Sequence, residues 1–293
     1  MWLAARGGST GEELTDKVCS AADAVHRLVP NGCRVLAVGG MHLHNNPMAL
    51  VFELVRQKRR IARLVTSPSA SLNADVLIGA GLTGEVATSY VGFEHLGLAP
   101  RFRSAAEAGT LKVLDLCEAA ITHGLHAGAS GLPFAVLPQG LELADVWRAN
   151  PESYRMIVDP FSQEPVLVVS AIRPDVTVIH AAEADEQGTT WLAGAHFTDR
   201  IMAMAARTVI VQVERVVSTE SMSRRPAGST LPGFLVTAVV ESAGGCLPTS
   251  SHGNYPYDEP AIKEYLNMAR TAEGFEEWMS RAAPERLAGV SAK

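Results

Sequence analysis

Short apolar runs alternate with segments of helical periodicity along most of the chain. Residues 33–38 (CRVLAV) form a compact apolar run, which is typical of a buried strand. After Pro47, by contrast, Leu50, Val51, Leu54 and Val55 are spaced so that they share one face of a helix. The same alternation predicts further strands at residues 61–65, 85–91, 111–116, 166–170, 176–180, 208–213 and 234–240, and further helices at residues 11–29, 74–80, 101–108, 118–129, 198–206, 259–271 and 274–282. Strands that alternate with helices predict an α/β fold with a mostly parallel, twisted sheet and helices on both faces.

The length and hydrophobic content of the chain suit one large α/β domain or two halves that share an interface. We expect residues 1–29 to form an N-terminal lead-in helix, residues 30–283 a single α/β domain, and residues 284–293 a C-terminal tail. Between residues 138 and 165 the periodicity weakens. A long segment of this kind predicts an excursion over the surface that acts as a lid or as an interface arm.

The first predicted strand ends in a turn that lets a ligand come close to the backbone. Gly39 and Gly40 allow a sharp turn, and Asn46 before Pro47 predicts a helix start with Asn46 as the cap. A strand, a glycine turn and a helix N-terminus together direct several N–H groups at one spot outside the sheet, where ligands of parallel sheets bind. Such a spot can hold a phosphate, a carboxylate or a developing oxyanion. We therefore expect part of an active site here.

Two glutamates follow other predicted strands at the same end of the sheet. Glu118 comes directly after residues 111–116 and opens a helix. A carboxylate in a first helical turn often only stabilises the helix dipole, but at the ligand-binding end of a strand it can act as an acid, a base or a nucleophile. Glu94 follows residues 85–91 in a similar way and can equally be an ordinary loop residue.

Composition narrows the classes of function. The 293 residues are 47% hydrophobic, which is enough for a large core. The net charge is −6 and the only basic run covers residues 58–60, so nucleic-acid binding is not expected.

Four widely spaced cysteines favour reduced thiols and a cytoplasmic protein. We expect neither a signal peptide nor a membrane span, because the N-terminus has no long apolar segment and no run of eighteen apolar residues occurs.

Searches for short catalytic motifs are negative. The chain has no GxGxxG or GxxxxGK[ST] phosphate loop, no GxSxG elbow and no HExxH pair. His42 and His44 form an HxH pair, but no other potential ligand has a convincing spacing. We therefore expect no metal and no permanently bound cofactor.

Several motifs, in order, resemble the A (alpha) subunit of family I coenzyme A transferases, the group that includes glutaconate and 3-oxoacid CoA-transferases. The resemblance covers roughly residues 30–272. It rests on VGG…NPMAL at 38–50, SYVGFEHLGLAP at 89–100, CE…GLHAGASGLPF at 117–134, RPDVTVIHAAEADEQG at 173–188, VERV at 213–216 and LPGF at 231–234.

The resemblance implies the open α/β fold of that family, here over residues 30–283, and an αβ or (αβ)2 heteromer that moves CoA between an acyl-CoA and a carboxylic acid. The nucleophilic glutamate is then expected in a Glu-x-Gly setting of the B (beta) subunit, because this chain shows no clear counterpart. On this chain, Gly39 and Gly40 would supply oxyanion-hole N–H groups. The resemblance also implies a set of substrate-binding residues: Met41, Asn45, Ser67, Ser69, Tyr90, Phe93 and Glu94.

A second hypothesis for the function follows from relatives of these transferases that act as hydrolases or decarboxylases on CoA thioesters. Ring-opening enzymes of steroid catabolism have an A-subunit glutamate that matches Glu118 by the spacing to the downstream Gly-Leu…Leu-Pro-Phe sequence. Glu118 would then be the general base of a retro-Claisen C–C cleavage. A third reading, a ligand-binding subunit without a catalytic site, also stays open.

Overall fold

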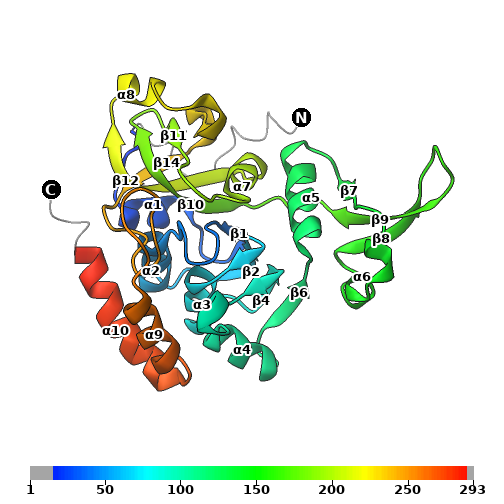
Figure 1. The fold of residues 1–293 in the computed structure, drawn as a ribbon, viewed down its shortest axis with the longest axis horizontal. Coiled ribbons are helices and arrows are strands. Elements are labelled where there is room, and N and C mark those ends of the chain that lie inside the picture. The colour runs from blue at the N-terminus through cyan, green and yellow to red at the C-terminus, as the bar shows by residue number, and fades with distance from the viewer. Residues whose placement is uncertain (1–15, 289–293) are drawn as a thin grey trace.

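The fold is built on a nine-stranded, mostly parallel sheet, seen in a computed structural model that describes residues 16–288 (Figure 1). The path through the sheet is β13-β11-β10-β1-β2-β4-β6, and β12 and β14 extend it beside β10. All pairs are parallel except β10–β11 and β11–β13. The strands are β1 (Cys33–Val38), β2 (Ile61–Thr66), β4 (Glu85–Thr88), β6 (Lys112–Asp115), β10 (Val176–Asp185), β11 (Thr190–Trp191), β12 (Thr208–Val217), β13 (Thr230–Leu231) and β14 (Ala238–Glu241). The predicted fold class is confirmed.

Helices cover both faces of this sheet, as the alternation predicts. Successive side chains of a strand point to opposite faces, so Leu36 and Val38 of β1 join one apolar cluster and Ala37 joins another. The first face is covered by α1 (Ala21–Leu28), α2 (Met48–Arg56), α3 (Leu72–Gly79), α9 (Glu259–Met268) and α10 (Ala272–Ala288). The second is covered by α5 (Glu118–Ala129) and α7 (Asp199–Ala205). The remaining helices are α4 (Pro100–Glu107), α6 (Val146–Ala149) and α8 (Thr219–Ser223).

A small antiparallel sheet projects from the body of the molecule beyond α5 (Figure 1). We call it the arm. Its strands are β7 (Phe134–Val136), β8 (Tyr154–Val158) and β9 (Pro165–Ser170), in the order β7-β9-β8. The arm exposes apolar side chains, among them Phe134, Val136, Val158 and Phe161. The weak periodicity of residues 138–165 thus conceals α6 and β8, which are short and half-exposed.

Three predicted boundaries are wrong. Helix α1 begins only at Ala21, because the Ser20 side chain caps it and Val18 pairs with Val239 instead; residues 11–15 of the predicted helix lie outside the described residues. The predicted strand over 85–91 is divided into β4 and β5 (Tyr90–Val91). Residues Gly233–Leu235 form a 3-10 turn, so β14 starts at Ala238.

Two predictions about helix ends are also corrected. Asn46 is not the N-cap of α2; Pro47 takes that position, and the Asn46 side chain instead donates to the His42 carbonyl at 2.8 Å. Helix α10 continues to Ala288, past the predicted helix end at residue 282 and into the predicted tail. Within the described part of the chain, no helix has the length and apolar character that a membrane crossing needs.

Candidate active site at the carboxyl edge of the sheet

The carboxyl ends of four parallel strands are level with one another. Val38 of β1 pairs with Thr66 of β2, and Thr88 of β4 pairs with Asp115 of β6. The Thr66 and Thr88 hydroxyls are also hydrogen-bonded at 2.7 Å, which ties β2 to β4 at this edge. The loops that follow these strands therefore share one edge, and ligands of such sheets bind at this edge.

The loop after β1, residues 39–46, lies at the centre of this edge. It forms a tight turn in which Met41 and His44 exchange two backbone hydrogen bonds of 2.9 Å. Asn45 connects it to two distant loops, because its side-chain amide donates to Ala195 O at 2.9 Å and its oxygen accepts from the His252 N–H at 3.4 Å. Asn45 is almost fully buried, so in this chain it holds loops together.

The N–H groups of Gly39 and Gly40, which are the predicted oxyanion-hole donors, both have hydrogen-bond partners within the chain. The Gly39 N–H donates to Val178 O at 2.9 Å, and the Gly40 N–H donates to the buried Asp199 carboxylate at 2.9 Å. Gly40 has a φ of +97°, a conformation that favours glycine. These two glycines therefore allow close packing and a sharp turn, while their donors are used inside the chain.

Three of the predicted substrate-binding residues belong to the framework of the site. Ser67 is fully buried and its hydroxyl accepts from Thr198 at 3.2 Å. Ser69 contributes its carbonyl, which accepts from the His42 N–H at 2.7 Å. Phe93 has no exposed surface, because its ring packs in the core 5.7 Å from the ring of Tyr265.

Tyr90, Glu94 and Glu118 are predicted site residues with accessible side chains, and Met41 is likewise only partly buried. The Glu94 N–H donates to the Tyr90 hydroxyl at 3.2 Å, and the Glu94 carboxylate lies 3.5 Å from His42 Nδ1. Glu118 is exposed at the first turn of α5, and its side chain has no hydrogen bond or ion pair within the described residues. The structure brings Tyr90 and Glu94 to the loop after β1, and it places Glu118 at the end of the outermost strand of the same edge.

His42 and His44 have different neighbours, so they do not act as a pair. His42 faces Glu94 and the edge of the Tyr90 ring. His44 instead bonds the Ser250 hydroxyl at 2.6 Å, and its ring packs against Tyr257.

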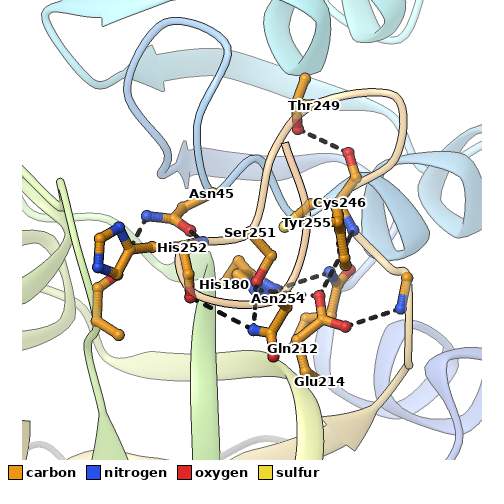
Figure 2. A network of polar contacts seen from close by, with 12 residues as sticks. Asn45, His180, Gln212, Glu214, Cys246, Thr249, Ser251, His252, Asn254 and Tyr255 are labelled. Atoms are coloured by element: carbon orange, nitrogen blue, oxygen red, sulfur yellow. Dashed lines mark hydrogen bonds and ion pairs between the residues drawn. The ribbon is translucent and has the colours of Figure 1, made fainter. Parts of the chain in front are cut away.

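A buried polar network lies beside this loop, on β10 and β12, and sequence reasoning missed it (Figure 2). Gln212 donates to His180 Nδ1 at 3.0 Å, which leaves the proton on Nε2 to be donated to the Ser251 hydroxyl at 3.0 Å. Glu214 accepts from the Tyr255 hydroxyl at 2.5 Å and from the Gly244 N–H at 2.8 Å. These bonds fasten the loop of residues 242–257 onto the sheet. The sequence did contain a signal for this network, because His180 and Gln212 are polar residues inside two strands that are otherwise largely apolar.

Burial sets the charge state of this network. It lowers the pKa of His180 to about 3, so the imidazole is neutral at pH 7. Burial also raises the pKa of Glu214 and raises that of the Cys246 thiol well above its usual value. Ligand atoms of these three residues lie within 4.8 Å of one another, as a metal site requires. Because both His180 nitrogens are hydrogen-bonded and the thiol is protonated, we interpret the group as a hydrogen-bond network.

Comparison with known proteins identifies the family. The family model for coenzyme A transferase matches residues 18–242. The glutaconate CoA-transferase of Acidaminococcus fermentans has an A subunit that is 34% identical over 283 residues, which cover 90% of this chain and 88% of that protein. The 3-oxoadipate CoA-transferase of Pseudomonas knackmussii has an A subunit that is 35% identical over 260 residues, with coverages of 88% and 90%.

Other relatives have different names or lengths. A cholesterol ring-cleaving hydrolase IpdA subunit from Rhodococcus jostii is 29% identical over 277 residues, with coverages of 90% and 91%. An uncharacterized protein from Archaeoglobus fulgidus is 34% identical, and the match spans only 60% of its length.

Solved structures show the same relationship. The crystal structure of glutaconate coenzyme A-transferase from Acidaminococcus fermentans superposes with a TM-score of 0.83 at 31% identity, covering 94% of this chain and 93% of that chain. The decarboxylase AibA/AibB gives a TM-score of 0.79 at 33% identity, with coverages of 91% and 100%. Because the family model covers most of the sequence and the relatives align nearly from end to end, this chain belongs to the coenzyme A transferase family, where it is related to the A subunits.

Proposed function

We propose that this chain is the A subunit of a heteromeric acyl-CoA:carboxylate CoA-transferase. The observation that carries the proposal is the match of about nine-tenths of the chain to the A subunits of two transferases at 34% and 35% identity. The match to the ring-cleaving hydrolase protein is weaker, at 29%.

In the proposed reaction, a glutamate on the B-type partner attacks the thioester carbonyl of the acyl-CoA. The C–S bond breaks, CoA leaves as a thiolate, and an acyl-glutamyl anhydride remains. The thiolate then attacks the glutamyl carbonyl, which releases the first acid and leaves a glutamyl-CoA thioester. The acceptor acid takes CoA by the reverse of these steps. Binding of the long CoA arm supplies energy that can be used at the thioester.

Features of this chain support a partner subunit. Two glutamates here stand in a Glu-x-Gly sequence. Glu107 is paired with Arg103 at 2.7 Å at the end of α4, before β6 begins, so it lies away from the carboxyl edge, whereas Glu186 is exposed in the turn between β10 and β11. The exposed apolar side chains of the arm form a surface of the kind that subunit interfaces cover.

The trapping of a covalent intermediate tests the proposal. When the complex of this chain with its B-type partner is treated with acyl-CoA and then borohydride, we expect irreversible inactivation and reduction of one glutamate on the partner, detected by peptide mass spectrometry. This chain alone, or the complex without acyl-CoA, should stay unmodified. Absence of any adduct, or an adduct on this chain, would contradict the proposed division of roles.

A second candidate is a CoA-thioester hydrolase or C–C lyase in which Glu118 is the base. It is favoured by the exposed Glu118 carboxylate at the ligand-binding edge, which has no partner among residues 16–288, and by the IpdA relative. If the chain is a transferase subunit, Glu118→Gln should keep its transfer rate within about tenfold, because the nucleophile is on the partner. If Glu118 is a general base, the water-dependent rate should fall by about 10²–10⁴. Glu107→Gln is the matched control in both assays.

A further inference from the structure

A pocket lies at the amino edge of the sheet, where the parallel strands begin, on the side away from the candidate active site. Its wall includes Lys58 and Arg60, which precede β2, and the turn of residues 79–82, which precedes β4. The length of β2 separates the two edges by about 20 Å. The pocket has a volume of about 610 Å³, which is in the range of pockets that bind small molecules. We call it the amino-edge pocket.

One part of the wall of this pocket is apolar. It consists of side chains from α2, from the turn before β4 and from α10, namely Phe52, Val55, Leu82, Phe275 and Met279. Gly79 lets this wall close up, because a Cβ there would lie 2.8 Å from both Arg101 Cγ and Phe275 Cζ. A wall of this kind favours a ligand with an apolar body.

Cationic side chains line the same pocket and outnumber its acids. Among the described residues, the cations in the wall are Arg56, Lys58, Arg60 and Arg101, and the one acid is Glu276. Arg56 is paired with the buried Glu53, which compensates its charge. No carboxylate of residues 16–288 lies within ion-pair distance of the other three cations. The pocket therefore has an excess of positive charge, which favours an anion.

Arg101 has hydrogen-bond donors that the chain does not use. A guanidinium carries five N–H groups, and the only hydrogen bond of this one within the described chain runs from Nη1 to Ala269 O at 3.5 Å. Its Nε is one of four buried side-chain polar atoms there without a partner. The nearby Asp75 carboxylate instead accepts from the Tyr265 hydroxyl at 2.5 Å and from backbone N–H groups. A carboxylate ligand is the complementary acceptor for such a guanidinium.

We propose that the amino-edge pocket binds a small anion with an apolar body, of the chemical class of medium-chain fatty acids. Arg60 and Arg101 flank the turn of residues 79–81, since Arg60 Nη1 donates to Gly81 O at 3.3 Å and the Arg101 stem packs on Gly79. The carboxylate binds between these two cations, and the hydrocarbon chain packs against the apolar wall. This site does not depend on the proposed transferase function, because its lining residues lie away from the carboxyl edge.

Titration calorimetry of the full chain with octanoate tests the site, with 1-octanol and acetate as its two separate halves. We expect octanoate to have a lower dissociation constant than either, because only octanoate combines an anionic group with an apolar body. Arg101→Gln should raise the dissociation constant for octanoate about tenfold, since it removes charge-assisted hydrogen bonds. Arg60→Gln should raise it about threefold, because solvent screens that exposed cation.

Ala80→Phe separates the shape of the pocket from its charge. Ala80 lines the pocket, and a larger side chain there should weaken the binding of octanoate and of 1-octanol alike. Arg224→Gln is the matched control for charge, since Arg224 is exposed just after α8 and outside the pocket, and it should bind octanoate as wild type does.

Two results in the full chain would overturn the inference. One is octanoate binding no tighter than acetate or 1-octanol, and the other is equal octanoate binding by wild type, Arg60→Gln and Ala80→Phe. These two variants decide the question even if Arg101→Gln fails to fold. The titration is repeated on the complex with the B-type partner, where retained binding supports the site. Loss of binding there would also count against it, because the partner then covers the pocket.

Discussion

Gly39→Ala is expected to lower the free energy of unfolding by about 3–5 kcal/mol and to abolish turnover of the complex. A Cβ at this position would lie 2.4 Å from Asp199 Oδ1 and 2.7 Å from Ile179 Cγ2. Asp199 is fully buried and cannot retreat without breaking its bonds to the Gly40 N–H and to His196, each 2.9 Å long. The expected cost combines overpacking with the loss of a charge-assisted hydrogen bond.

Urea denaturation measures this effect, with Gly84→Ala as the control. A Cβ at Gly84 meets no atom within 4 Å, so that variant should unfold near the wild-type midpoint. If Gly39→Ala unfolds there as well, the packing of Asp199 against this glycine is not what fixes the loop.

His180 is expected to make the protein sensitive to acid, and His180→Gln to remove that sensitivity. The pKa of His180 is about 3 in the folded chain and 6.5 in the unfolded chain. Below pH 6.5 the unfolded chain therefore binds a proton that the folded chain does not. Stability from this residue is complete above pH 6.5 and decreases as the pH falls toward 3, by about 1.4 kcal/mol per pH unit. Between pH 6.5 and pH 5 the loss is about 2 kcal/mol.

Glutamine preserves the hydrogen bonds without titrating, because its oxygen can accept from Gln212 and its amide can donate to Ser251. Asp75 acts in the opposite direction. Burial raises its pKa to about 6, so the folded chain takes up that proton first and gains stability as the pH falls from 6 to 3.8. Asp75 is present in both proteins, and the difference between wild type and His180→Gln therefore isolates His180. Unfolding in urea at pH 7 and pH 5 measures it, with the exposed His126→Gln as control. Equal acid slopes in wild type and His180→Gln would refute the assignment.

Local sequence patterns were sufficient to predict a helix or strand where contacts with distant segments did not change its structure. Strand β1 and helix α5 are observed at the predicted residues. Both are determined locally: β1 is an apolar run that ends in glycines, and α5 has alanines and glycines between its apolar residues. Residues 16–20 show the opposite case. Their apolar spacing fits a helix, yet Val18 pairs with Val239, which lies more than two hundred residues later.

The same distinction between local and long-range determinants explains which parts of the site could be predicted. The carboxyl ends of the parallel strands lie at one edge, so topology alone predicts that Tyr90, Glu94 and the glycine turn share this edge. What occupies the Gly39 and Gly40 N–H groups could not be predicted, because Val178 and Asp199 come from segments far along the chain. The network of His180 and Glu214 was missed for the same reason: its partners, Ser251 and Tyr255, belong to a loop whose position only the folded structure fixes.

The arm bears on how much of this polypeptide a cell can make relative to its proposed partner. Its outer strands, β7 and β8, offer unpaired edges next to exposed Phe134, Val136 and Val158, and such edges template association between identical molecules. A surplus of this polypeptide over its proposed partner would therefore be prone to self-association and proteolysis. Balanced synthesis of the two polypeptides, for instance from one messenger, would protect it.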